Sequence, residues 1–170
     1  MKTKTCLSAI FLIFLFVAEV PGTEIWEEFS GVKWGSPLAS LKGLQKTHTD
    51  AYVQYFVRPE EVYALDDLVL GKVTYGFYLE KFYAAFIDID TRAKFDRTME
   101  LLQLKYGKPR ANLSLNQTVY IWDYQQVKIK LKQDNPNQAF KLGYYYTPLS
   151  EALNQQRIAK DGIKIRKLED

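Results

Sequence analysis

VLGKVTYGFYLEKFYAAFIDIDTRAKFDRTMELLQLKYGKP, residues 69–109, contains the signals that decide the fold class. Residues 69–80 and 82–90 are rich in β-branched and aromatic side chains, which predicts an antiparallel hairpin that turns near Glu80. A helix follows, with Thr91 as N-cap, an apolar stripe, and Gly107 placed for the left-handed residue after the last turn. The stripe consists of Phe95, Met99, Leu102 and Tyr106.

The segments on either side of this stretch also carry mostly strand signals. Strands are expected at 51–58, 61–65, 118–124, 126–132 and 139–147, with an extended segment at 26–32. In 126–132, apolar residues alternate with three lysines, which is typical of a half-buried antiparallel strand. A serine or threonine before a proline predicts short helices near 37–46 and 149–160.

The predicted fold class is therefore α+β. We expect a single twisted antiparallel sheet of about six strands, with the long helix 91–107 packed on one face and short helices near 37–46 and 149–160. Residues 23–160 are expected to form a single domain, and residues 161–170 a charged C-terminal tail without regular structure.

Residues 1–22 have the three parts of a secretory signal peptide. Lys2 and Lys4 precede the uncharged apolar run 7–18, and a small residue and a glycine precede the expected cut before Thr23. The run is too short for a span of about 20 residues, so no stable membrane span is expected after cleavage. The expected location is periplasmic or secreted. Cys6, the only cysteine, leaves with this leader, so no disulfide is expected.

The charge pattern argues against one class of partner. The net charge is +3, and acidic and basic residues alternate along the chain. Nucleic-acid binding usually needs a concentrated basic face, so no nucleic-acid partner is expected. A protein or a cell-envelope ligand is the expected partner.

Three motifs resemble a group of small exported bacterial proteins that have no assigned function. These are Gly31-Val32-Lys33-Trp34-Gly35, Val73-Thr74-Tyr75-Gly76-Phe77-Tyr78 and Lys105-Tyr106-Gly107-Lys108-Pro109. The resemblance covers most of the chain after the leader. It implies a single-domain periplasmic protein of bacterial origin, and it implies no functional residue.

Few residues in the sequence indicate catalysis or metal binding. His48 is the only histidine and lies in a polar connection, so a nucleophile–histidine pair is not expected. Asp88, Asp90 and Asp96 are acidic enough to hold a hard cation weakly, but the calcium-loop spacing is missing and no metal site is predicted. No cofactor motif is present, and no cofactor is expected. A carboxylate pair acting on sugars remains possible among six acidic residues: Glu60, Glu61, Asp66, Asp67, Asp88 and Asp90.

The aromatic content is the unusual feature, because Phe, Tyr and Trp make up 15% of the chain. Tyr120, Trp122 and Tyr124 share one face of a predicted strand, and Tyr144 and Tyr146 share a face of another. In one interpretation these rings fill a thick core that the chain itself covers. In the other they form an open binding surface, where Tyr and Trp contribute most per residue.

The function expected from the sequence is that of an exported, non-catalytic binding or envelope-assembly module that uses this aromatic sheet face. The sequence does not decide whether the protein is an enzyme, although it favours a non-catalytic protein. Two alternatives remain: a carboxylate-dependent hydrolase of envelope polymers, and an inhibitor of an exported enzyme.

Overall fold

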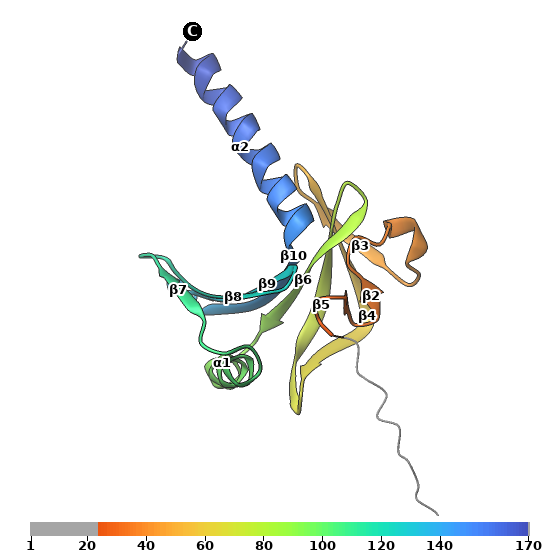
Figure 1. Ribbon diagram of the computed structural model, residues 1–170, viewed down its shortest axis with the longest axis vertical. Coiled ribbons are helices and arrows are strands. Elements are labelled where there is room, and N and C mark those ends of the chain that lie inside the picture. The colour runs from red at the N-terminus through yellow and green to blue at the C-terminus, as the bar shows by residue number, and fades with distance from the viewer. Residues whose placement is uncertain (1–23, 170) are drawn as a thin grey trace, which may run out of the picture.

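A large antiparallel sheet dominates the protein. The computed structural model describes the backbone of residues 24–169 and the side chains of residues 24–160, so the leader 1–22 and the side chains of the tail 161–170 lie outside the described part. Eight strands form the sheet in the order β3-β4-β5-β6-β10-β9-β8-β7 (Figure 1). Their bounds are Gln45–Thr49 (β3), Val53–Leu65 (β4), Leu68–Tyr78 (β5), Lys81–Ile89 (β6), Arg110–Leu113 (β7), Gln117–Tyr124 (β8), Val127–Asp134 (β9) and Ala139–Tyr146 (β10).

The sheet consists of two four-stranded meanders, each followed by a helix. Strands β3 to β6 lead into α1 (Arg92–Tyr106), and strands β7 to β10 lead into α2 (Thr147–Glu169). Neighbouring strands within each meander are joined by short turns and therefore pair antiparallel. The last strands of the two meanders, β6 and β10, pair with each other at the centre, with Ile87 opposite Leu142.

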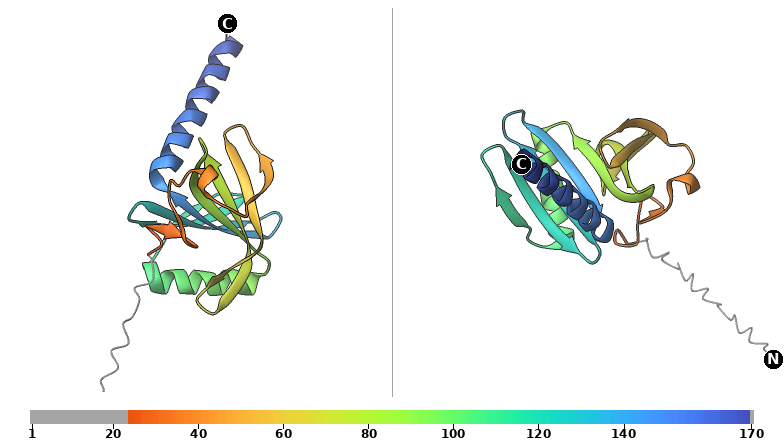
Figure 2. Two further views of the ribbon diagram at one scale, coloured as in Figure 1. Left: turned by 90° about the vertical axis from the view of Figure 1, so that its right-hand side faces the viewer. Right: turned by 90° about the horizontal axis from the view of Figure 1, so that it is seen from above.

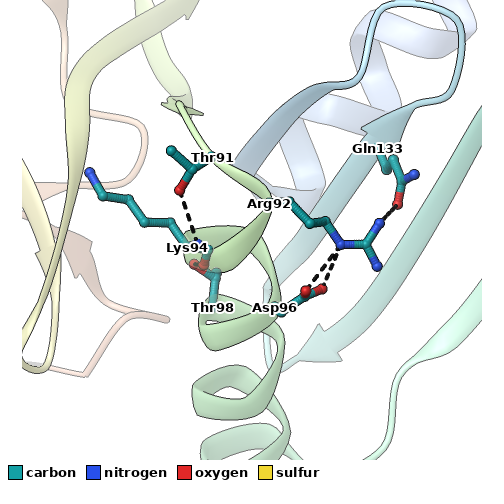
Figure 3. Close-up of polar contacts among 6 residues, drawn as sticks. All are labelled: Thr91, Arg92, Lys94, Asp96, Thr98 and Gln133. Carbon is teal, nitrogen blue, oxygen red and sulfur yellow. Dashed lines mark hydrogen bonds and ion pairs between the residues drawn. The ribbon is translucent and has the colours of Figure 1, made fainter.

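The first helix follows its sequence signals closely. The Thr91 side chain accepts a hydrogen bond from the backbone N–H of Lys94, and Gly107 after the last turn has a φ of 79°. The Arg92 guanidinium lies 2.8 Å from an Asp96 carboxylate oxygen, and it also donates to Gln133 of β9 (Figure 3). These contacts begin the helix and fasten it to the sheet.

The main hydrophobic core lies between α1 and one face of the sheet, which we call the core face. Phe95, Leu101 and Leu102 of α1 are buried against it. The N-terminal segment covers the rest of this face with a small hairpin, β1 (Glu28–Phe29) and β2 (Val32–Lys33), followed by Trp34. Helix α2 stands on the opposite side of the sheet from α1 (Figure 2).

The predicted fold class is wrong in its architecture. The protein is mostly β, with one eight-stranded sheet, a small two-stranded sheet and two helices, instead of a six-stranded sheet with one long helix. The helix expected at 37–46 is only a 3₁₀ turn at Leu38–Ser40, followed by β3. The helix expected at 149–160 begins at Thr147 and continues to Glu169, through the tail predicted to lack structure.

The missed strands are short and polar. All five side chains of β3 and all four of β7 are exposed, so neither strand has the apolar alternation that identifies a half-buried strand. They form because each pairs with a longer neighbour, β3 with β4 and β7 with β8. The segments 51–58 and 61–65 merge into β4, because a register shift between Val57 and Val62 accommodates Pro59.

Candidate functional site

The five aromatic residues that the sequence singled out all lie on the core face. Trp122 is 3% exposed and Tyr144 is 1% exposed, while Tyr120, Tyr124 and Tyr146 are half-buried. Helix α1 and the N-terminal segment cover this side of the sheet (Figure 1). The structure therefore brings these rings together with the core and does not leave Trp122 or Tyr144 open to a partner.

The polar atoms of the two fully buried residues, Trp122 and Tyr144, are satisfied within the chain. The Trp122 Nε1 donates to the backbone oxygen of Gly107 at 2.7 Å, and the hydroxyls of Tyr63 and Tyr144 lie 2.9 Å apart. The ring of Tyr124 packs against Tyr106, with centroids 5.0 Å apart. Such contacts are those of buried aromatic residues in a core.

The opposite side of the sheet has a different composition. Lys128, Lys130 and Lys132 of β9 and Lys141 of β10 project from it, and we call this side the lysine face. The first three are half-buried, since the strand alternates between the core face and this one. The prediction of a half-buried strand at 126–132 is confirmed by this alternation.

Two of the four lysines have acidic partners. Lys141 Nζ lies 3.2 Å from Asp88, and Lys128 Nζ lies 3.9 Å from Asp123, which is also paired with Arg110. Among side chains that the structure describes, neither Lys130 nor Lys132 forms an ion pair. These two half-buried ammonium groups are therefore not neutralised by a carboxylate.

Instead, both ammonium groups lie over one aromatic ring. The Nζ atoms of Lys130 and Lys132 are 4.7 Å and 6.0 Å from the ring centroid of Tyr145, which provides a weak cation–π attraction. Burial, together with repulsion from Lys132 and Lys128, lowers the pKa of Lys130, and burial and repulsion from Lys141 lower the pKa of Lys132. The positive charge on both groups is thus less favourable in the free protein than it is on an exposed lysine.

An aromatic row crosses the same face from β3 to β10. His48 stacks on Tyr55 with centroids 4.2 Å apart, Phe86 lies 6.0 Å from Tyr55, and Tyr145 lies 5.5 Å from Phe86. Registers across the strands put these residues on one face, with Tyr55 opposite Gly76 and Phe86 opposite Gly143. The row ends beside the two unpaired lysines.

Two glycines give these rings room to lie down on the sheet. A Cβ atom at Gly143 would lie 2.8 Å from the Tyr145 ring, and one at Gly76 would lie 3.1 Å from the Phe86 ring. The rings therefore occupy the space that side chains would take at these two positions. Because glycine has no side chain, the rings of Phe86 and Tyr145 can lie against the backbone at these two positions.

A cavity of about 420 Å³ lies on this row. Its lining combines the four rings with Thr74, Asp88, Lys132 and Lys141. A second hollow of about 350 Å³ adjoins it around Lys132, Lys141 and Asp134. The volume of the first falls within the usual range for small-molecule sites, and its lining offers aromatic surface, cations and a carboxylate.

Helix α2 is anchored at the rim of the lysine face, beside the β3–β4 turn. Leu153 is buried against Val53 and Tyr78, and Gln156 accepts a hydrogen bond of 2.7 Å from the Tyr78 hydroxyl. Arg157 lies 3.3 Å from the Asp50 carboxylate. The first half of α2 is thus fixed to the first meander.

Asp50 connects this helix to the aromatic row. Its carboxylate accepts hydrogen bonds from the backbone N–H groups of Tyr52 and Val53 and from the Tyr55 hydroxyl. Partial burial alone raises the pKa of the carboxyl, but these hydrogen bonds and the charge of Arg157 lower it below its usual value. The ionised form of Asp50 therefore stabilises the folded protein.

We expect this to appear as acid sensitivity. A carboxyl whose pKa is lower in the folded state contributes stability above its unfolded pKa, near 3.9, and loses it as the pH falls through the folded value. Urea unfolding at pH 6 and pH 3 should show that Asp50→Asn loses less stability on acidification than the wild type. Equal losses in the two proteins would contradict this role.

Five of the seven acidic residues considered for catalysis or metal binding have basic or hydroxyl partners, among them Asp67, which lies 4.0 Å from Arg97. Asp88 pairs with Lys141, Asp90 with Lys94, and Asp96 with Arg92. Glu61 accepts a hydrogen bond of 2.6 Å from the Tyr75 hydroxyl and lies 3.5 Å from Arg58. Within residues 24–160, no group of three or more His, Cys, Asp or Glu residues is arranged to hold a metal ion.

Sequence reasoning missed the lysine face as a site. The alternating lysines were recognised but were assigned only as the solvent side of a strand, and His48 was assigned to a loop. The hairpin of β9 and β10 places Gly143 and Tyr145 opposite two of the lysines and was a usable signal. The pairing of β10 with β6, which adds Phe86 to this face, is not readable from local patterns.

Neither helix that the structure describes is long and apolar enough to cross a membrane. No protein-family model matches the chain, and comparisons with curated proteins and with solved structures found no match. The function must therefore be argued from the residues of this chain alone.

Proposed function

We propose that the protein is a non-catalytic binding module that is exported from the cell and takes an anionic ligand on the lysine face. The observation that carries the proposal is the pair Lys130 and Lys132. Neither of these half-buried cations forms an ion pair with a described side chain, and both lie over Tyr145 beside a cavity. The leader-like residues 1–22 and the resemblance to exported bacterial proteins support the compartment.

The physical reason is that an anion removes a cost that the free protein bears. Burial lowers the pKa of both ammonium groups, and repulsion adds to this, from Lys132 and Lys128 on Lys130 and from Lys141 on Lys132, while Asp123 partly offsets it on Lys130. A carboxylate or phosphate between them replaces lost water with charge-assisted hydrogen bonds. Hydrogen bonds to charged groups contribute about 1.5–3 kcal/mol each.

The side chains around the proposed site favour binding of a ligand over catalysis. The carboxylates near the site are engaged, Asp88 by Lys141 and Asp123 by Lys128 and Arg110. His48, the only histidine, stacks on Tyr55, and its Nδ1 lies 3.2 Å from the Thr47 hydroxyl. The site offers fixed cations and rings, which bind and orient a ligand.

The test is the double variant Lys130→Met/Lys132→Met, which keeps the apolar stems and removes both charges. We expect binding of inorganic pyrophosphate, measured by isothermal titration calorimetry, to weaken at least tenfold. Thermal unfolding of the free variant should occur at the same temperature as the wild type or higher, because a desolvated repulsive pair is gone.

The matched control is Lys33→Met/Lys108→Met, which removes the same charge from two exposed lysines away from the lysine face. It should bind pyrophosphate like the wild type. If both double variants weaken binding equally, the effect is net charge alone and the proposed site is wrong. If Lys130→Met/Lys132→Met binds normally but unfolds earlier, the two lysines are structural.

A further inference from the structure

We infer that the ligand is an acidic sugar, whose ring stacks on Phe86 in the aromatic row and whose carboxylate reaches Lys132 at the wall of the cavity and Lys130 beside it. The inference rests on the proposed function and narrows it to one ligand class. Its starting point is that the cavity is lined by rings and by cations together, where a simple anion needs the cations only.

The aromatic part of the cavity offers apolar ring surface from residues whose planes are tilted to one another, Phe86 by 50° to Tyr55 and by 82° to Tyr145. Tyr55 and Phe86 are half-buried, so part of each ring faces the cavity, while Tyr145 lies beneath the two lysines. The negative faces of aromatic rings attract the weakly positive C–H groups on the flat side of a pyranose ring. Gly76 and Gly143 allow the rings to lie low, which leaves space above them.

The polar part matches a ring that carries both hydroxyls and a negative charge. Lys132 and Lys141 donate hydrogen bonds, whereas the Asp88 carboxylate only accepts them, and the Thr74 hydroxyl does both. A sugar hydroxyl satisfies Asp88 by donating to it, and a sugar carboxylate satisfies the lysines. A ligand without hydroxyls leaves Asp88 with Lys141 alone and the rest of its acceptor capacity unused.

Asp88 also argues against a chain of phosphates. Its carboxylate lies in the lining between the aromatic row and the lysines, and it repels a second negative charge placed there. Stacking platforms with basic grooves also bind single-stranded nucleic acids, whose backbone carries one negative charge per nucleotide. A ligand with one charge and several hydroxyls fits this mixed lining better.

The experiment compares five probes on the wild-type protein by calorimetry. The probes are galacturonate, its neutral methyl ester, N-acetylmuramic acid, pyrophosphate and oligo-dT. We expect at least one of the two acidic sugars to bind, and an acidic sugar that binds to do so at least tenfold more tightly than the neutral ester. Ring-proton resonances of Phe86 should shift with the acidic sugar and not with pyrophosphate.

Variants separate the two claims. Phe86→Leu should weaken acidic-sugar binding at least tenfold and leave pyrophosphate binding unchanged, and Phe86→Tyr should restore the sugar affinity. The Phe86 shift in the wild type provides a readout that does not depend on how well the leucine variant folds. Lys108→Met serves as the neutral control.

The outcomes distinguish failure of the inference from failure of the proposed function. If pyrophosphate binds through Lys130 and Lys132 while both acidic sugars do not, the ligand class is wrong and the anion site stands. Tighter binding of oligo-dT than of either sugar also overturns the ligand class. If no anionic probe binds, both proposals fall.

Discussion

Replacing Trp122 by alanine is expected to lower the free energy of unfolding by about 3–5 kcal/mol, the usual cost of truncating a buried large aromatic residue. The side chain is 3% exposed and belongs to the core under α1. The substitution also leaves the backbone oxygen of Gly107, just after α1, without its hydrogen bond from Nε1. Urea unfolding followed by circular dichroism measures the loss.

The matched variant is Trp122→Phe, which keeps an aromatic ring and loses the indole N–H. It should lose clearly less stability than the alanine variant, because much of the buried apolar surface remains. A normal unfolding curve for Trp122→Ala, combined with loss of anion binding, would contradict a core role. That outcome would instead support the sequence-based interpretation in which Trp122 belongs to a binding surface.

Phe29→Ala is expected to have a similarly large effect, about 3–5 kcal/mol of unfolding free energy. Phe29 is 0% exposed, although it lies in a two-residue strand near the start of the described chain. Its ring stacks on Tyr63 at 5.3 Å and contacts Tyr144 at 5.3 Å and Trp34 at 6.2 Å. The short N-terminal hairpin thus supplies part of the centre of the core.

Phe29→Leu provides the control, since it keeps an apolar side chain of similar size and should retain most of the stability. The double variant Lys33→Met/Lys108→Met should unfold like the wild type, because both lysines are exposed. Equal stability of Phe29→Ala and the wild type would show that the N-terminal hairpin is dispensable for the core.

The local elements were predictable where one segment contains all its own signals. Thr91, the apolar stripe and Gly107 together specify α1, and their geometry matches the prediction. The hairpins were predictable for the same reason, because β5–β6 and β8–β9 join apolar or alternating strands through short turns. Strands β3 and β7 were not predicted, because their side chains are polar and exposed. They are strands because they pair with β4 and β8.

The proposed binding face was harder to predict, because the alternation of side chains separates two faces of a strand without showing which face is covered. Trp122 and Tyr124 lie on one side of β8 and Asp123 on the other, and either side is compatible with that pattern. The choice is made by α1 and by the N-terminal hairpin, which lie far away in sequence. The rings opposite them, Phe86 and Tyr145, became visible only once β6 and β10 were paired.

The seam between β6 and β10 has a consequence for how the chain acquires its shape. Each meander closes through neighbours in sequence, whereas the seam pairs Ala84 with Tyr145, about 60 residues further along the chain. Contacts between distant residues are the slow ones to form. The aromatic row crosses this seam and the lysines of β9 lie beside it, so the proposed site is assembled only after β10 has been made. A nascent chain that still lacks β10 therefore lacks the proposed site.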